Sequence, residues 1–167
     1  MTVFYLTVKA SKAMRKNISH TPDIVPKFDG WFVDIFNVGR KKLVLITHHL
    51  SFLSFVTYLS HIGGSDRIPD WFMNEFHSFC EEKNISHAAL ERLKMQHSFH
   101  KTNSRIVIGH MTDIKNVIFH SMEEKGEHVA WKETSNFLHT FLMKYPSGEY
   151  SEPLLEFMKL LDIKDLT

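Results

Sequence analysis

Hydrophobic residues follow two different spacings along the chain, with strand-like runs in its amino-terminal part and helix-like stripes after them. The β-branched and aromatic run Val3–Val8 predicts a first strand, and the Ala and Lys content of Lys9–Asn17 predicts one or two helical turns. The segment Ile18–Gly30 contains two prolines, which predicts a loop.

The clearest strand signals come next. The segments Trp31–Asn37, Lys42–His48 and Phe52–Ser60 are separated by short polar stretches, which predicts three antiparallel strands in a meander. Alternate positions of the first of these strands are apolar on one face and mostly apolar on the other, where Asp34 is the exception, so we expect both faces to be covered. Leu43–Ile46 shows no alternation and predicts a strand that is buried on both faces.

Beyond the glycine pair at 63–64 the spacing becomes helical. Phe72, Phe76, Phe79 and Cys80 form one stripe, which predicts a helix ending near Lys83. The chain then predicts a helix over Ser86–Gln96, an extended segment over Ser98–Lys101, a helix capped by Thr112 or Asp113 and stopped by Gly126, and further helices over Val129–Lys144 and after Ser151.

Strands followed by helices, with no repeat or linker between them, predict one α+β domain over residues 1–167. We expect an amino-terminal antiparallel sheet, built from the first strand and the three-stranded meander, with the carboxyl-terminal helices packed on it.

The composition excludes several classes of protein. With 43% hydrophobic residues in 167 and a single cysteine, the chain is neither disordered nor held together by internal disulfides. Lys and Arg total 20 against 19 for Asp and Glu, so no overall charge points to a nucleic acid or a membrane. Any such partner must therefore be recognised by a local patch.

The uncharged stretch Leu43–Ser65 is long enough to span a bilayer. Its histidines, hydroxyl side chains and β-branched residues favour strands instead, and the Val3–Val8 run lacks the features of a signal peptide. We therefore expect a cytoplasmic protein without membrane association, in which Cys80 stays reduced. Because Cys80 lies on an apolar stripe, we expect its thiol to be buried and unreactive.

Two segments carry a family resemblance: residues 30–46, GWFVDIFNVGRKKLVLI, and residues 101–113, KTNSRIVIGHMTD. They resemble a bacterial family of small proteins described only as a domain of unknown function, in which a Trp-x-Ala-Asn-Leu strand and a basic pair precede Lys-Thr-x-Asn-Arg-Ser-x-Leu-Gly-x-Met-Asn-Asp. The positions kept are Trp31, Arg40, Lys41, Lys101, Thr102, Arg105, Gly109, Met111 and Asp113. The departures are Val33, Asp34, Ile35, Asn103, Ser104, Ile106 and Thr112. The resemblance implies a shared fold and no particular activity.

The second of these segments holds the main candidate ligand site. Thr102, Asn103 and Ser104 are typical helix-capping residues, and the Arg105 guanidinium can bind a phosphate or carboxylate. One interpretation is an anion or nucleotide-like site at a helix amino terminus. The alternative is a structural corner in which Arg105 pairs with Asp113, since the glycines of a phosphate-binding loop are missing.

For acid–base chemistry the best candidates are His100 or His110, oriented by Asp113. The chain has 12 histidines, but they are scattered and no zinc-binding motif accompanies them, so we expect neither a metal nor another cofactor. The scattered imidazoles are typical of polar, half-buried positions.

A basic turn forms a second candidate surface. Arg40 and Lys41 fall at the first turn of the meander, and Trp31 is close in sequence, so a small basic and aromatic patch could contact a nucleic acid or another partner. The alternative is a solvated turn.

Two functions remain open from the sequence. The leading hypothesis is a cytoplasmic binding or regulatory protein that acts through a protein or nucleic-acid partner, in a mobile-element or phage-defence context. The second is a small enzyme acting on a nucleotide or nucleic-acid phosphate, with Arg105 as anion clamp, His100 or His110 as acid–base group and Asp113 as orienting carboxylate. A pocket that unites these side chains favours the enzyme, whereas an exposed apolar patch favours the binding protein.

Overall fold

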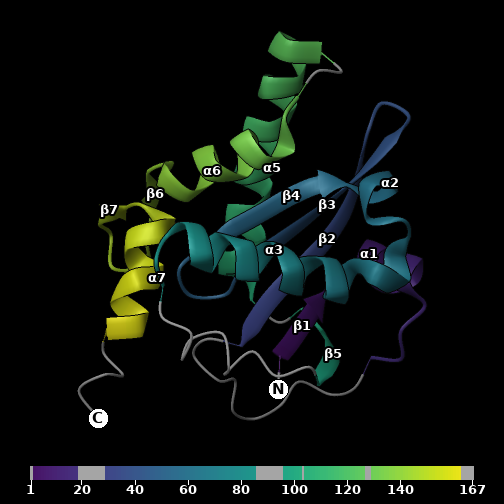
Figure 1. Ribbon diagram of the computed structural model, residues 1–167, viewed down its shortest axis with the longest axis horizontal. Helices are drawn as coiled ribbons and strands as arrows, with labels where there is room; N and C mark the ends of the chain where they lie inside the picture. The colour runs from purple at the N-terminus through teal and green to yellow at the C-terminus, as the bar shows by residue number, and fades with distance from the viewer. Residues whose placement is uncertain (1, 19–28, 86–95, 103, 127–128, 163–167) are drawn as a thin grey trace.

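A five-stranded sheet with helices on both faces forms the centre of the molecule (Figure 1). The computed structural model describes residues 2–18, 29–85, 96–102, 104–126 and 129–162. The strand order is β4-β3-β2-β1-β5. The strands are β1 (Thr2–Leu6), β2 (Gly30–Val38), β3 (Lys41–His48), β4 (Ser54–Tyr58) and β5 (His97–Lys101). The predicted α+β class is confirmed.

The direction of the strands differs in part from the expectation. The meander is confirmed, because β2 pairs antiparallel with β3 and β3 with β4. However, β1 pairs parallel with both β2 and β5, so the sheet is mixed rather than antiparallel throughout. The segment between β1 and β2 contains helix α1 (Val8–Met14) and exceeds the dozen residues that a parallel crossover needs.

The helices follow the apolar stripes of the sequence. They are α1, α2 (Leu59–Ile62), α3 (Ile68–Glu82), α5 (Arg105–Lys125), α6 (Trp131–Thr140) and α7 (Pro153–Asp162), with a 3₁₀ turn at Ser65–Arg67 and a small hairpin of β6 (Met143–Lys144) and β7 (Tyr150–Ser151). The helix predicted over Ser86–Gln96 falls almost entirely outside the described residues.

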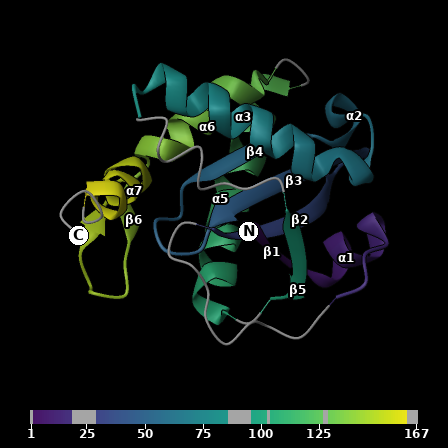
Figure 2. The same cartoon turned by 60° about the horizontal axis from the view of Figure 1, so that its bottom comes forward.

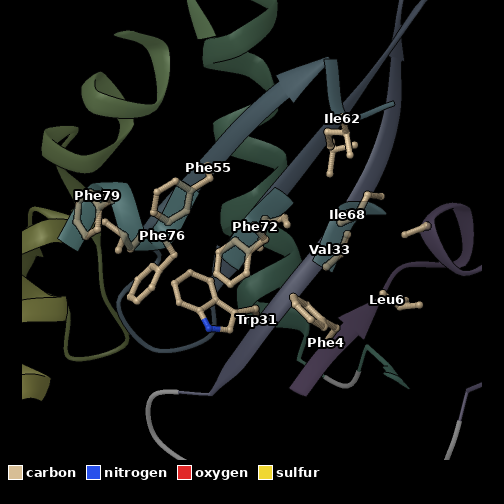
Figure 3. Packing of buried hydrophobic residues seen from close by; sticks show 14 of the residues in the cluster. Phe4, Leu6, Trp31, Val33, Phe55, Ile62, Ile68, Phe72, Phe76 and Phe79 are labelled. Atoms are coloured by element: carbon tan, nitrogen blue, oxygen red, sulfur yellow. The ribbon is translucent and has the colours of Figure 1, made fainter. Parts of the chain in front are cut away.

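Two apolar cores lie on the two faces of the sheet (Figure 2). On one face, α1, α3 and α7 contribute to a core in which the Trp31 ring centroid lies 4.6 Å from that of Phe72 and 5.4 Å from that of Phe76 (Figure 3). On the other face, α5 contributes Val107, Met111, Ile114 and Ile118. The segment Leu43–Ile46 is fully buried between these cores, as its uniform apolar character predicts.

Helix α5 begins earlier than the sequence indicates. Its N-cap is Ser104, whose hydroxyl accepts a hydrogen bond from the Val107 N–H at 3.3 Å, so the prediction of a cap at Thr112 or Asp113 is wrong. The apolar stripe already begins at Val107, and Gly109 lies in the helix with nothing near its α-carbon that a side chain would meet. A glycine in mid-helix lowers helix propensity without ending the helix.

Side chains of α6 cover the outer edge of β4. The Ser135 hydroxyl accepts a hydrogen bond from the Val56 N–H at 3.1 Å, and His139 Nε2 donates to the Ser54 carbonyl at 2.8 Å. These bonds occupy backbone groups that an edge strand otherwise offers to another chain. His139 is 2% exposed, and this burial lowers the pKa of its imidazole to about 4.

The buried imidazole predicts a loss of stability in acid. Below its usual pKa of 6.5, His139 in the unfolded chain takes up a proton that it does not bind in the folded protein until the pH approaches 4. The free energy of unfolding should therefore fall by about 3 kcal/mol between these two pH values through this residue. Urea unfolding at pH 7 and pH 4.5 measures the fall.

The control is His139→Gln, whose amide keeps a donor for the Ser54 carbonyl but does not titrate. This variant should lose clearly less stability than the wild-type protein over the same pH range. An equal loss in both proteins would show that His139 is not the group that responds.

Candidate functional site

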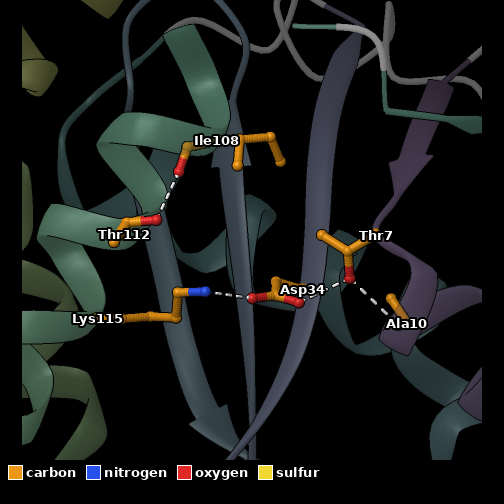
Figure 4. Close-up of polar contacts among 6 residues, drawn as sticks. All are labelled: Thr7, Ala10, Asp34, Ile108, Thr112 and Lys115. Atoms are coloured by element: carbon orange, nitrogen blue, oxygen red, sulfur yellow. Dashed lines mark hydrogen bonds and ion pairs between the residues drawn. The ribbon is translucent and has the colours of Figure 1, made fainter. Parts of the chain in front are cut away.

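One buried carboxylate, that of Asp34, joins three elements on the α5 face of the sheet (Figure 4). The Thr7 hydroxyl donates to Asp34 Oδ1 at 2.6 Å, and Lys115 Nζ donates to Oδ2 at 2.8 Å. The Thr7 oxygen also caps α1 by accepting from the Ala10 N–H at 3.2 Å. Both carboxylate oxygens thus accept a hydrogen bond, and the cluster connects β2 to the start of α1 and to the middle of α5.

The sequence signal for this cluster is a charged residue in an otherwise apolar strand. The alternation of residues predicts Asp34 on the mostly apolar second face of its strand, but it does not identify the partners of the carboxylate. Thr7 and Lys115 lie 27 and 81 residues away from it. Lys115 lies four residues after Met111 and three before Ile118, so it borders the buried apolar stripe of α5.

The first turn of α5 forms one wall of a surface cavity of about 320 Å³, lined by Thr102, Ser104, Arg105 and Ile108. Ser104 caps the Val107 N–H, which leaves the N–H groups of Arg105 and Ile106 without a partner inside the helix. Arg105 is exposed. This arrangement favours an anion, because the unpaired N–H groups, the helix dipole and the guanidinium all attract negative charge.

A second cavity, of about 310 Å³, shares Ser104 with the first as a lining residue. Its floor is aromatic and buried, and part of its rim is apolar and exposed, notably Leu50 at 41% and Ile106 at 53%. The described residues that line it are Tyr5, Phe32, His49, Leu50, Phe52, Ser104, Ile106, Val107 and Pro146. Strands β1 and β2, the β3–β4 turn, α5 and the β6–β7 turn thus all contribute to this corner of the molecule.

Two features mark the floor of this second cavity. Tyr5 is 1% exposed, and no hydrogen-bond partner for its hydroxyl exists among the described residues. Burial also raises the pKa of Tyr5 above its ordinary value, so the hydroxyl keeps its proton. Phe52 has a φ of 58°, which is rare for a bulky residue, and its ring stacks on those of His110 and Tyr145.

The structure brings some predicted site residues together and separates others. Thr102 and Arg105 share the first cavity, whereas Asn103 lies outside the described residues. His100 is buried on β5, with Nε2 3.0 Å from the Ser98 hydroxyl, and it does not line either cavity. Asp113 is exposed, two turns beyond Arg105 on α5, and no ion pair joins these two residues.

His110 stays at the edge of this corner. Its ring centroid is 3.8 Å from that of Phe52, and its Nδ1 has no hydrogen-bond partner among the described residues. Burial lowers the pKa of His110, and the Asp113 carboxylate opposes this shift only in part. The imidazole is therefore neutral near pH 7. It is not held by Asp113 in the way that a catalytic pair requires.

The basic turn is exposed, but its aromatic component differs from the prediction. Arg40 and Lys41 are exposed at the β2–β3 turn, and Lys41 Nζ lies 5.0 Å from the centre of the Tyr58 ring. Trp31 is fully buried at the other end of β2, opposite His48. The prediction that Trp31 belongs to a surface patch is wrong, because the extended strand carries it away from the turn.

Other chemical groups give no site in the described part of the chain. Cys80 is buried, as predicted, and burial raises the pKa of its thiol to about 12, which disfavours the reactive thiolate. No three of the described histidines, cysteines and carboxylates gather in an arrangement that could hold a metal ion. None of the described helices has the length and apolar character needed to cross a bilayer.

A groove of about 520 Å³ runs between α5 and α6, away from the corner described above. Its apolar lining is Val117, Phe137 and Phe141, and Phe137 is 50% exposed. Glu124, Glu133 and Lys125 are the charged residues that line it.

Taken together, the fold and the corner define a small α+β domain with a ligand-sized cavity at a helix amino terminus. The chain belongs to the family described as "Domain of unknown function (DUF6933)", whose model matches residues 3–156. This match confirms the expectation of a family described only as a domain of unknown function. A search of curated proteins gave no match.

The Asp34 cluster predicts an asymmetric response to mutation. The side chain of Asp34 is 7% exposed and that of Lys115 is 25% exposed. Lys115→Met removes the ion-pair partner of Asp34 and leaves a buried, uncompensated carboxylate, so it should lower the free energy of unfolding by about 3 kcal/mol. Asp34→Asn keeps an acceptor for Thr7 and lets the lysine turn to solvent, so it should cost about 1 kcal/mol. Urea unfolding measures both values.

The matched control is Lys159→Met, which breaks an exposed ion pair with Glu156 on α7 and should change stability by less than about 0.5 kcal/mol. A larger loss from Asp34→Asn than from Lys115→Met would contradict this account of the cluster.

Proposed function

We propose that this protein is a binding protein that takes a small anionic ligand at the corner formed by β1, β2, the β3–β4 turn and the start of α5. The observation that carries the proposal is a cavity that holds the helix amino terminus and Arg105 and shares Ser104 with a second cavity, which is lined by Tyr5, a residue whose buried hydroxyl has no partner among the described residues. Thr102 and Arg105, the ligand-binding residues predicted from the sequence, line the first cavity.

The charges at the corner support an anion as the ligand. A negative group beside a helix amino terminus is stabilised by about 0.3–1 kcal/mol. A hydrogen bond from a guanidinium to an anion adds about 1.5–3 kcal/mol. Among the described residues, no carboxylate lines either cavity to oppose these contributions.

Binding is better supported than catalysis. The enzyme hypothesis needs His100 or His110 and Asp113 around Arg105, but none of these three lines the cavity that Arg105 occupies. A proton acceptor must come within hydrogen-bond reach of the reacting group. A bound anion would here contact a guanidinium, hydroxyls and N–H groups, which hold charge without transferring a proton at neutral pH. A cytoplasmic location is part of the proposal, and the reduced, buried Cys80 is compatible with it.

A second candidate function is binding of a macromolecular partner at the α5–α6 groove. The exposed Phe137 favours it, and the described residues that line the groove include two glutamates and one lysine. This combination fits an amphipathic helix of a partner protein with basic residues beside its apolar face. The two candidates are distinguished in cells by the variant that loses function, Arg105→Ala for the ligand corner or Phe137→Ser for the groove.

The ligand proposal predicts that Arg105→Ala weakens anion binding without destabilising the protein. Loss of the guanidinium should lower the affinity for inorganic pyrophosphate about ten-fold. The melting temperature should stay within about 2 °C of the wild-type value, because the residue is exposed. Isothermal titration calorimetry and thermal unfolding measure the two quantities.

Arg40→Ala is the control, since it removes the same charge from an exposed turn at which no cavity of the corner lies. It should leave pyrophosphate binding unchanged. If both variants weakened pyrophosphate binding equally, the effect would come from overall charge and not from the proposed site. A large drop in the melting temperature of Arg105→Ala would show that Arg105 is a structural residue.

A further inference from the structure

The basic residues of the chain are unevenly distributed, although its overall charge is close to zero. Lys and Arg total 20 against 19 for Asp and Glu, but residues 1–22 contain no acidic residue and four basic ones, Lys9, Lys12, Arg15 and Lys16. All four lie on helix α1 or within two residues of its end. A partner of opposite charge that is recognised by a local patch therefore has a candidate surface at α1.

The cations of α1 face solvent. The helix buries Ala10 and Met14, while Lys9, Lys12 and Arg15 are exposed. In the described part of the chain, no acidic residue forms an ion pair with any of these three, whereas three lysines on other elements each have such a partner. The positive charge of α1 is thus not neutralised by the described residues.

The end of β5 extends this surface. Strand β1 leads into α1 and pairs parallel with β5, which ends at the exposed Lys101. Beyond the other end of α1, Lys16 Nζ lies 5.3 Å from the centre of the Phe99 ring of β5, and Figure 2 shows the two elements side by side. The neighbouring 3₁₀ turn contributes Arg67 together with Asp66, so it leaves the local balance of charge unchanged.

The positions of these cations are unfavourable in the free protein. Lys9 lies in the first turn of α1, where the helix dipole disfavours positive charge and no acidic residue compensates it. Lys9 and Lys12 are three residues apart, so they are neighbours on the helix surface and repel each other. Arg15 ends the helix at a φ of 49°, a left-handed conformation that favours glycine or asparagine. A bound polyanion would relieve the repulsion and make use of the arginine.

The chemistry of the surface favours a nucleic acid over a protein or a membrane. Lysine is depleted at protein–protein interfaces, which depend on buried aromatic anchors. On α1 itself, Val8 is the one large apolar side chain that is exposed, and a membrane-bound helix needs a whole apolar face. The phosphates of a nucleic acid, in contrast, are contacted by Lys and Arg without any apolar anchor.

We propose that α1 and the end of β5 bind the phosphate backbone of a nucleic acid, independently of base sequence, through the exposed residues Lys9, Lys12, Arg15 and Lys101. This inference goes beyond the proposed anion site and does not depend on it, because none of these four residues lines either cavity of the corner. It assigns nucleic-acid binding to α1 and not to the basic turn at Arg40.

The test measures binding of the full chain to labelled oligo(dT), oligo(U) and a mixed-sequence DNA duplex of equal length by fluorescence anisotropy over a range of salt concentrations. The logarithm of the binding constant should fall with the logarithm of salt concentration with a slope of about −3, since four phosphate contacts contribute about 0.7–0.9 each. Binding of the single strands or of the duplex supports the proposal, and the preferred probe identifies the form that is bound.

The double variant Lys9→Gln/Lys12→Gln tests the surface, because glutamine keeps the helix propensity and removes the charge. It should weaken binding of the preferred probe about ten-fold at low salt and reduce the slope by about half. Arg40→Gln/Lys42→Gln is the matched control, since it removes the same charge from an exposed turn. The control should leave both quantities unchanged.

Two single variants separate binding from folding. Lys9→Glu places an acidic residue in the first turn of α1, and Arg15→Gly places glycine at a positive φ. Neither should lower the melting temperature, but both should weaken binding of the preferred probe about three-fold or more. If the two variants lower the melting temperature and leave the affinity unchanged, these cations are structural and the proposal is wrong.

Other outcomes also overturn the proposal. It fails if none of the oligonucleotides binds, if the control weakens binding as much as the Lys9 and Lys12 variant, or if poly-glutamate binds as tightly as the preferred probe. Pyrophosphate binding, measured by calorimetry, should be the same in the wild-type protein and in the α1 variants. Its absence from all of them would overturn the proposed anion site and leave the nucleic-acid surface intact.

Discussion

A carboxylate in the middle of a sheet must have its charge compensated, and the way in which Asp34 meets this requirement determines how the elements on one face of this protein are arranged. Its two oxygens accept hydrogen bonds from Thr7, at the start of α1, and from Lys115, in the middle of α5. Helix α5 is 21 residues long and packs on the sheet mainly through a narrow apolar stripe. The ion pair adds a directional contact to this packing, so it fixes where along β2 the helix lies.

The position of α5 in turn creates the corner that we propose as the ligand site. Parallel pairing sets Tyr5 of β1 opposite Phe32 of β2, and the stripe of α5 places Val107 against the same core. The first turn of the helix then lies beside the β3–β4 turn, where Phe52 adopts its unusual backbone conformation. A shift of α5 along the sheet would separate its amino terminus from the aromatic floor. We therefore regard the buried ion pair as structural and the corner as the place where the chain binds.

Local sequence patterns predicted the elements but not all of their relations. The meander, the doubly buried segment Leu43–Ile46 and the helix carrying Phe72 and Cys80 followed directly from the period of apolar residues. The direction of β1 did not, because strand direction depends on the crossover and leaves no periodic signal. Trp31 is close to Arg40 in sequence, but a strand rises about 3.3 Å per residue, so the two side chains lie at opposite ends of β2. Gly109, followed by the capping residue types Thr112 and Asp113, indicated a later start of α5 than the structure shows.

The candidate site was predicted in part for the same reason. Thr102 and Arg105 are close in sequence and carry recognisable chemistry, so their shared cavity was accessible to prediction. The aromatic half was not, because Tyr5, Phe52 and Pro146 come from three distant segments and only the fold brings them together. His100 was chosen for its chemistry, but strand alternation places it inside the sheet–helix interface.

The most direct test of the central claim locates a bound ligand on the protein. Two-dimensional ¹H–¹⁵N NMR spectra of the labelled chain, recorded during titration with inorganic pyrophosphate, report which backbone amides respond. The account predicts that the largest shifts occur at Arg105 and Ile106 and at the residues around Tyr5 and Phe52, while α7 is unaffected. Shifts centred on the Arg40 turn or on the groove between α5 and α6 would contradict it.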